Sequence, residues 1–162
     1  MSNLLVNTVE DTTMWYHCQQ WLPHCGIMRC SEVSMDSTEF SQIRRHLGKT
    51  QAQIARLLGV STKAIQSFEQ GWRNVPAHSE RQLLFLLYLK SLPDAGCEPC
   101  WDKRSCPLKV RKECPAWEFK AGNLCWFING TLCEGKVQQN WQKKMQLCRQ
   151  CKVFISLIPA FN

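Results

Sequence analysis

The chain has 162 residues, 11 of them cysteine, and a formal net charge of +7. Its apolar runs at residues 83–89 and 153–161 are shorter than the ~20 residues that a bilayer requires, which excludes a membrane-spanning protein. The first 30 residues lack the basic start and apolar stretch of a secretory signal, so we expect a cytoplasmic protein whose thiols stay reduced.

The cysteines and the charges divide the chain into three segments. Eight cysteines follow residue 96, three lie before residue 31, and residues 31–96 hold none. Residues 1–35 show no period of 3.6 or 2, so we expect an irregular or disordered arm, or an over-extended start, because Met35 directly precedes the first helical pattern. Residues 36–92 carry eight Lys or Arg against four Asp or Glu, an excess that fits a nucleic-acid partner and ordinary solubility alike.

Residues 36–92 show the pattern of four short helices. Apolar residues recur three and four apart through residues 40–47, and Gly48 is suited to end that helix. Thr50 followed by Gln53 forms a capping box, which predicts the start of a second helix.

A tight turn is predicted after the second helix. Gly59 can take a left-handed conformation, Val60 fills the corner, and Ser61 is a good N-cap for a third helix, which Gly71 ends. A corner this short lets the third helix project from the bundle, as a helix that enters a major groove must.

A fourth helix is predicted over residues 79–91, with Ser79 and Gln82 as its cap. Its run at residues 83–89 is apolar on every side, so more than one face must be covered. One face can close the helical bundle. We expect a second subunit or the cysteine-rich segment to cover the other.

The outer face of the third helix is polar near its N-terminus. Lys and Gln side chains at such positions reach base edges, and basic side chains around them contact phosphates. Gln51, at the start of the second helix, is placed to bond a phosphate and to brace the third helix. The DNA-binding residues predicted in this way are Lys49, Gln51, Arg56, Thr62, Lys63, Gln66, Ser67 and Arg73.

The stretch KTQAQIARLLGVS at residues 49–61, continued by FEQG at residues 68–71, resembles the Cro/phage-repressor (Xre) family of helix-turn-helix regulators. The resemblance covers residues 40–75. It implies a compact all-helical domain, usually a homodimer on a two-fold symmetric operator in double-stranded DNA. The bulky segment at residues 72–76 departs from the family pattern, so no target sequence is carried over. The family's contacts map onto Gln51, Thr62, Lys63, Gln66 and Ser67.

Two C-x-x-C pairs bracket the segment at residues 97–155. Such a pair binds a metal from one turn, and two pairs can complete a four-thiolate site, although a long stretch separates them here. A Cys-Trp pair occurs twice, at residues 100 and 125, which suggests two lobes that each offer ligands. A segment of this size buries little surface and often needs metal to stabilise it. The predicted metal ligands are Cys97, Cys100, Cys106, Cys114, Cys125, Cys133, Cys148 and Cys151.

The two Cys-Trp pairs, the strings CPAW at 114–117 and GTLC at 130–133, and CRQCKVF at 148–154 resemble the two-CW domain of bacterial signalling and regulatory proteins. This resemblance covers about residues 97–155 and implies a regulatory setting, but it fixes no metal. Structural zinc, an iron–sulfur cluster and reversible dithiol chemistry all fit an all-cysteine set. Catalytic zinc fits poorly, because its ligands commonly include His and the segment contains none.

The expected fold is a mainly α N-terminal helix-turn-helix bundle over residues 36–92, joined to a small cysteine-rich, metal-stabilised C-terminal module over 97–155. We expect a DNA-binding transcriptional regulator whose module binds metal or senses redox state. The alternative is a protein-interaction adaptor with a structural zinc module. A thiol oxidoreductase acting through Cys148 and Cys151 would need an exposed thiol of low pKa, usually at the start of a helix, and no βαβ pattern surrounds the pair. No other catalytic signature appears, so no enzyme activity is expected.

Overall fold

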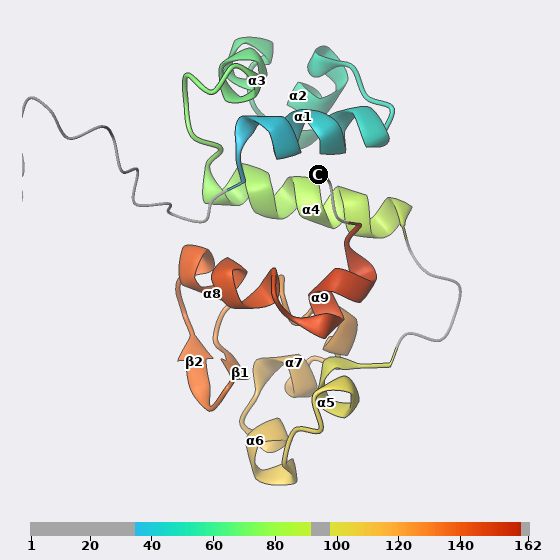
Figure 1. Cartoon of the computed structure of the whole chain (residues 1–162), viewed down its shortest axis with the longest axis vertical. Coiled ribbons are helices and arrows are strands. Elements are labelled where there is room, and N and C mark those ends of the chain that lie inside the picture. The colour runs from blue at the N-terminus through green and yellow to red at the C-terminus, as the bar shows by residue number, and fades with distance from the viewer. Residues whose placement is uncertain (1–34, 92–97, 160–162) are drawn as a thin grey trace, which may run out of the picture. The chain divides into compact units, whose positions relative to one another are not determined.

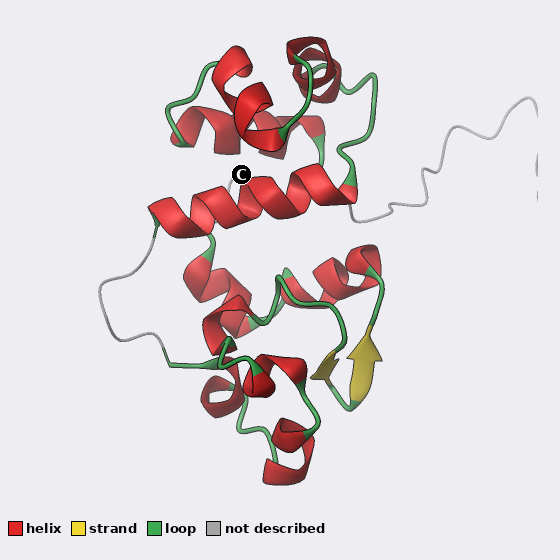
Figure 2. Cartoon of the chain, turned by 180° about the vertical axis from the view of Figure 1, so that it is seen from behind, coloured by secondary structure: helices red, strands yellow, loops and turns green. Residues whose placement is uncertain are grey.

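The computed structural model describes residues 35–91 and 98–159 (Figure 1). These residues are mainly helical, with one two-stranded sheet (Figure 2), which confirms the predicted α-rich fold. The arm predicted for residues 1–35, apart from Met35, and the predicted ligand Cys97 lie outside the described residues. Within the two described stretches, no helix combines the length and apolar character needed to cross a membrane.

Four helices make up the first described stretch, and side-chain caps begin three of them. The capping box predicted at Thr50 and Gln53 is present, with both hydrogen bonds formed. The Ser61 hydroxyl accepts a hydrogen bond from the Ala64 N–H at 3.1 Å, as expected of an N-cap. The helices are α1 (Ser37–His46), α2 (Gln51–Leu58), α3 (Thr62–Glu69) and α4 (Ala77–Lys90).

The start of α4 differs from the prediction. Pro76 is its N-cap, so the helix begins at Ala77, and the predicted cap at Ser79 is wrong. Proline has no N–H to leave unpaired and therefore suits the start of a helix. The capping pattern at Ser79 had predicted a later start. Ser79 lies inside the first turn with 0% exposure, and Gln82 donates its side-chain hydrogen bond to the Leu57 carbonyl of α2 instead.

The second described stretch consists of short elements. Strands β1 (Thr131–Cys133) and β2 (Lys136–Gln138) pair antiparallel, with Leu132 opposite Val137. Gly122 allows a close approach between elements, because a Cβ there would lie 2.4 Å from the Cβ of Pro99. The remaining elements are α5 (Cys100–Lys103), α6 (Leu108–Lys112), α7 (Pro115–Glu118), the 3-10 helix η1 (Gly122–Leu124), α8 (Trp141–Cys148) and α9 (Lys152–Leu157).

The second face of α4 packs against the cysteine-rich segment. The rings of Phe85 and Phe127 lie 5.2 Å apart, and those of Tyr88 and Trp126 lie 6.2 Å apart. Trp126 is fully buried and belongs to the same hydrophobic cluster as the α1–α4 core. Of the two covers expected for α4, the structure therefore provides the cysteine-rich segment, and the two described stretches belong to one compact unit.

Candidate functional site

The corner between α2 and α3 positions the first candidate site. Gly59 ends α2 in the left-handed conformation, with a φ of 65°, which costs glycine little. The next N–H, that of Val60, returns a hydrogen bond to the Ala55 carbonyl at 3.0 Å. Helix α3 then begins at Thr62, so only three residues separate it from α2. The two helices thus meet at a sharp, well-bonded corner.

Helix α3 is held in place by both apolar and polar contacts. Phe68 packs edge-on against Phe40 of α1, with 5.8 Å between ring centroids. The Glu69 carboxylate at the end of α3 accepts hydrogen bonds from Arg44 of α1 and, at 2.7 Å, from Gln51 of α2. Burial raises the pKa of Glu69, but these hydrogen bonds outweigh it and hold that pKa below its ordinary value. Glu69 is therefore a carboxylate that joins three helices.

The predicted base-reading residues differ in their exposure. Thr62, Lys63 and Gln66 are exposed on α3. Ser67 is half-buried, and its hydroxyl donates to the Lys63 carbonyl at 3.0 Å. Gln51 is half-buried and makes the bracing contact to α3 that the sequence predicts, through Glu69.

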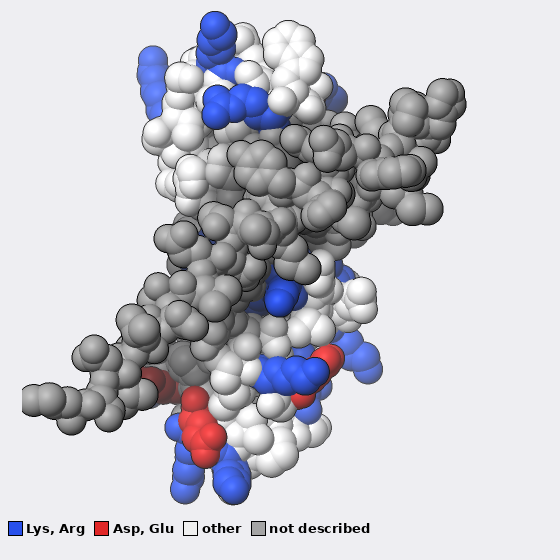
Figure 3. Space-filling model, turned by 90° about the vertical axis from the view of Figure 1, so that its left-hand side faces the viewer, with Lys and Arg blue, Asp and Glu red and all other residues white. Residues whose placement is uncertain are grey.

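The predicted phosphate contacts Lys49, Arg56 and Arg73 are all exposed. Where α1–α3 lie in Figure 3, the coloured side chains in view are all Lys or Arg. Trp72 stands beside Arg73 with 77% of its surface exposed, an unusual value for so large an apolar group. The surface around α3 therefore presents polar and basic groups.

The second candidate site is a cavity of about 40 Å³ in the cysteine-rich segment. Both Cys-Trp pairs line it, so the two lobes expected from the sequence share one cavity. Within the described residues, no three Cys, His, Asp or Glu side chains are spaced to hold a metal ion as they stand. The cysteines that line the cavity are Cys100, Cys106, Cys114, Cys125, Cys133, Cys148 and Cys151.

Several donors surround these sulfurs. The Leu132 N–H donates to the Cys114 Sγ at 3.5 Å, and the Arg104 guanidinium donates to the Cys151 Sγ at 3.8 Å. Trp126 also lines the cavity, and its buried indole N–H has no hydrogen-bond partner among the described residues. Sulfur accepts hydrogen bonds best as a thiolate, so this donor set suits thiolate ligands.

The thiols differ in their acidity. Burial raises the pKa of the Cys148 thiol to about 11. The Cys125 thiol donates a hydrogen bond to Cys100, which raises the pKa of Cys125 and lowers that of Cys100. A nucleophilic thiol needs a low pKa and access to solvent, and Cys148, the first residue of its C-x-x-C pair, has neither.

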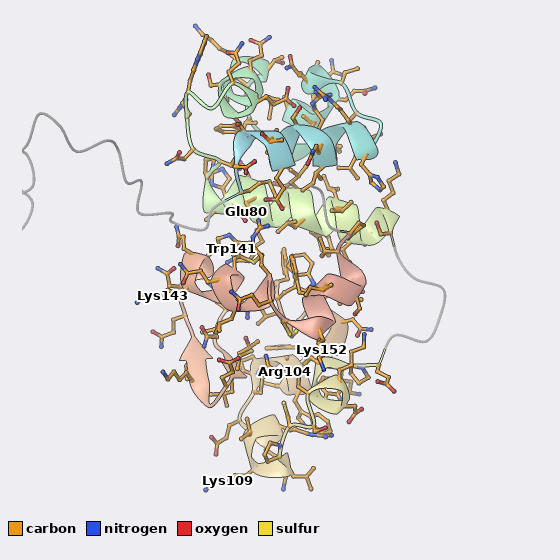
Figure 4. The ribbon with its side chains drawn as sticks, in the orientation of Figure 1. Glu80, Arg104, Lys109, Trp141, Lys143 and Lys152 are labelled. Atoms are coloured by element: carbon orange, nitrogen blue, oxygen red, sulfur yellow. The ribbon has the colours of Figure 1, made fainter. Side chains whose placement is uncertain are left out.

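A polar cluster joins the two described stretches. The Trp141 indole of α8 donates to the Glu80 carboxylate of α4 at 2.9 Å, and Figure 4 shows the two side chains facing each other. Arg149, adjacent to Cys148, pairs with Glu80 at 3.2 Å and with Glu39 of α1 at 2.7 Å. Sequence patterns gave no sign of these contacts, because 61 residues separate Trp141 from Glu80.

The chain matches no family model, no curated protein and no solved structure.

Proposed function

We propose that this chain is a DNA-binding transcriptional regulator in which α2, the Gly59 corner and α3 form a helix-turn-helix. The observation that carries the proposal is the exposure of Thr62, Lys63 and Gln66 on a helix that is anchored from behind. A reading helix must be rigid on its buried side and free on its outer side, because base contacts depend on its exact insertion into the groove.

The basic groups supply the remaining affinity. Lys49, Arg56 and Arg73 are exposed, and each would contact a phosphate and release counterions. Gln51 donates one hydrogen of its amide nitrogen to Glu69, which braces α3, and the second hydrogen of the same nitrogen is left for a phosphate. The protein is proposed to act as a homodimer, so a selected binding site should contain two inverted half-sites about one DNA turn apart.

Gln66→Ala provides the sharpest test of base reading. We expect binding to a duplex selected from a random library to weaken by about 1–3 kcal/mol, because a lost base contact has that value. Binding to an unrelated duplex should change little. The measurement is fluorescence anisotropy on both duplexes over a series of salt concentrations.

The matched control is Gln146→Ala, which removes an exposed Gln from α8. Equal affinities of the two variants for the selected duplex would contradict a base-reading role for Gln66. If no duplex could be selected and DNA binding showed no dependence on salt, the regulator proposal would be wrong. The protein-interaction adaptor would then be favoured.

The cysteine-rich segment is proposed to bind metal through its thiolates, as zinc or as an iron–sulfur cluster. Seven cysteines share one cavity with N–H donors around them, which suits soft metals and thiolate ligands. When bound, such a metal would cross-link the short elements, and an iron–sulfur cluster would add redox sensitivity. The thiols would draw together on binding, with Cys97 completing its C-x-x-C pair.

Anaerobic purification followed by elemental analysis and a visible spectrum distinguishes the two metals. Zinc without colour would indicate a structural site, whereas iron and sulfide with a brown absorption would indicate a sensing cluster. A chain that contains neither metal and takes up neither under reducing conditions would contradict the metal proposal and leave the DNA-binding proposal standing.

A further inference from the structure

Lys144 of α8 is buried among the cysteines. Its side chain is 1% exposed and lines the thiol cavity, and its ammonium donates a hydrogen bond to the Thr131 hydroxyl. Within the described stretches, no carboxylate forms an ion pair with it. A buried cation without an anion is strongly unfavourable, so its position requires an explanation.

The walls of the cavity contain further positive charge and no carboxylate. Arg104 and Arg111 line it together with Lys144, whereas neither Asp nor Glu is among the described lining residues. Arg111 pairs with Asp102 at 3.1 Å, and Arg104 pairs with the exposed Glu134 at 3.6 Å, both outside the lining. The groups in the cavity that can carry negative charge are therefore the cysteine sulfurs.

We propose that Lys144 is the counter-charge of an anionic metal–thiolate centre formed by the cysteines of this cavity. Four thiolates around one divalent ion leave an excess of about two negative charges, and a buried ammonium offsets one of them at short range. A disulfide or a set of neutral thiols would leave the ammonium uncompensated. This inference rests on the proposed metal binding and assigns it a charge and a positioning residue.

Lys144→Met is expected to affect the metal-free and the metal-bound protein differently. Met has nearly the shape of Lys without its charge, so the metal-free chain should become no less stable, and the metal-bound form should be weakened. Loss of an outer partner of a metal ligand typically lowers metal affinity about 10- to 100-fold, and we expect a loss in this range. Lys144→Arg should retain most of the affinity, because it keeps the charge.

The experiment uses the full chain, reduced and free of metal, under anaerobic conditions. Co(II) is titrated in and followed by its sulfur-to-metal charge-transfer absorption, with a chelator in competition to obtain the affinity. Stability with and without Co(II) is measured by denaturant unfolding and circular dichroism. Lys143→Met is the matched control, since Lys143 is the exposed neighbour on α8 and points outward in Figure 4.

The outcomes separate the two proposals. A wild-type chain that binds no Co(II) and no Zn(II) overturns the metal-binding proposal and this inference with it. If the wild type binds Co(II) and Lys144→Met binds it as tightly as Lys143→Met, metal binding stands and the counter-charge is overturned. A Lys144→Met chain that is destabilised equally with and without metal, or unfolded in both states, shows a purely structural lysine and also overturns the inference.

Discussion

Glu80 is a buried carboxylate that connects α4 to α8. It is 1% exposed and accepts hydrogen bonds from the Trp141 indole and the Arg149 guanidinium. Burial raises the pKa of Glu80, and these two partners offset that effect only in part. A carboxyl whose pKa is higher in the folded state stabilises the fold below its unfolded pKa, and this contribution is lost as the pH rises through the folded pKa.

Glu80→Gln should therefore gain stability relative to the wild type as the pH rises from about 4.5, the ordinary pKa, towards neutrality. Gln imitates the neutral carboxyl and can still accept the Trp141 hydrogen bond, while Arg149 keeps Glu39. A difference of one in pKa corresponds to about 1.4 kcal/mol of unfolding free energy. The measurement is urea unfolding at several pH values, in reductant and chelator.

Glu118→Gln is the control, because Glu118 is exposed and its surroundings change little on folding. The opposite result would be an unfolding free energy of Glu80→Gln that decreases relative to wild type as the pH rises. It would show that the partners of Glu80 favour its charged form.

At the scale of elements, the angle between α2 and α3 depends on one left-handed residue. Gly59→Ala places a Cβ in open space, since nothing lies within 4 Å of it, so its cost is conformational. An L-residue in this conformation costs about 1–2 kcal/mol. We expect the corner to open and shift α3, which lowers affinity for a selected duplex in addition to the loss of stability.

Gly48→Ala controls for strain alone. Gly48 has a φ of 69°, and a Cβ there would also have nothing within 4 Å. Gly48 lies after α1, however, and not at the α2–α3 corner. Unfolding by denaturant and anisotropy with DNA measure both effects. Equal DNA affinities of the two folded variants would argue against a role for the corner in positioning α3.

At the scale of the whole molecule, the helical bundle and the cysteine-rich segment share a core. Trp126 contacts Tyr88 of α4 and Phe154 of α9, with ring centroids 6.2 Å and 5.8 Å apart. Trp126→Ala should lower the free energy of unfolding by about 3–5 kcal/mol, because it leaves a large cavity in the core. Because the core is continuous, we expect a single unfolding transition, shifted as a whole, in thermal scans followed by circular dichroism.

Trp72→Ala is the matched control, since Trp72 is 77% exposed and its loss should change stability by no more than about 0.5 kcal/mol. Two separate transitions, only one of them moved by Trp126→Ala, would mean that the segments on either side of residues 92–97 unfold independently.

The sequence by itself determined the local structure of the first four helices. The capping box at Thr50, the left-handed Gly59 and the N-cap Ser61 act within four residues of their own positions. Their structural effect can therefore be predicted from the neighbouring sequence. The exposure of Thr62, Lys63 and Gln66 followed from the same helical period. Ser79 shows the limit of such patterns. Its capping sequence predicted a helix start at residue 79, but the helix begins directly after Pro76.

Only the tertiary structure decided how the cysteines and charges come together. The sequence identified the cysteines as a group, but their spacing suggested two lobes, whereas seven of them line one cavity. Nothing in the chain marked Lys144 as buried, or Glu80 as the partner of Trp141, since an adjacent lysine, Lys143, is exposed. Such contacts depend on the packing of elements distant in sequence, and burial then sets the cost of each charge and the partner it requires.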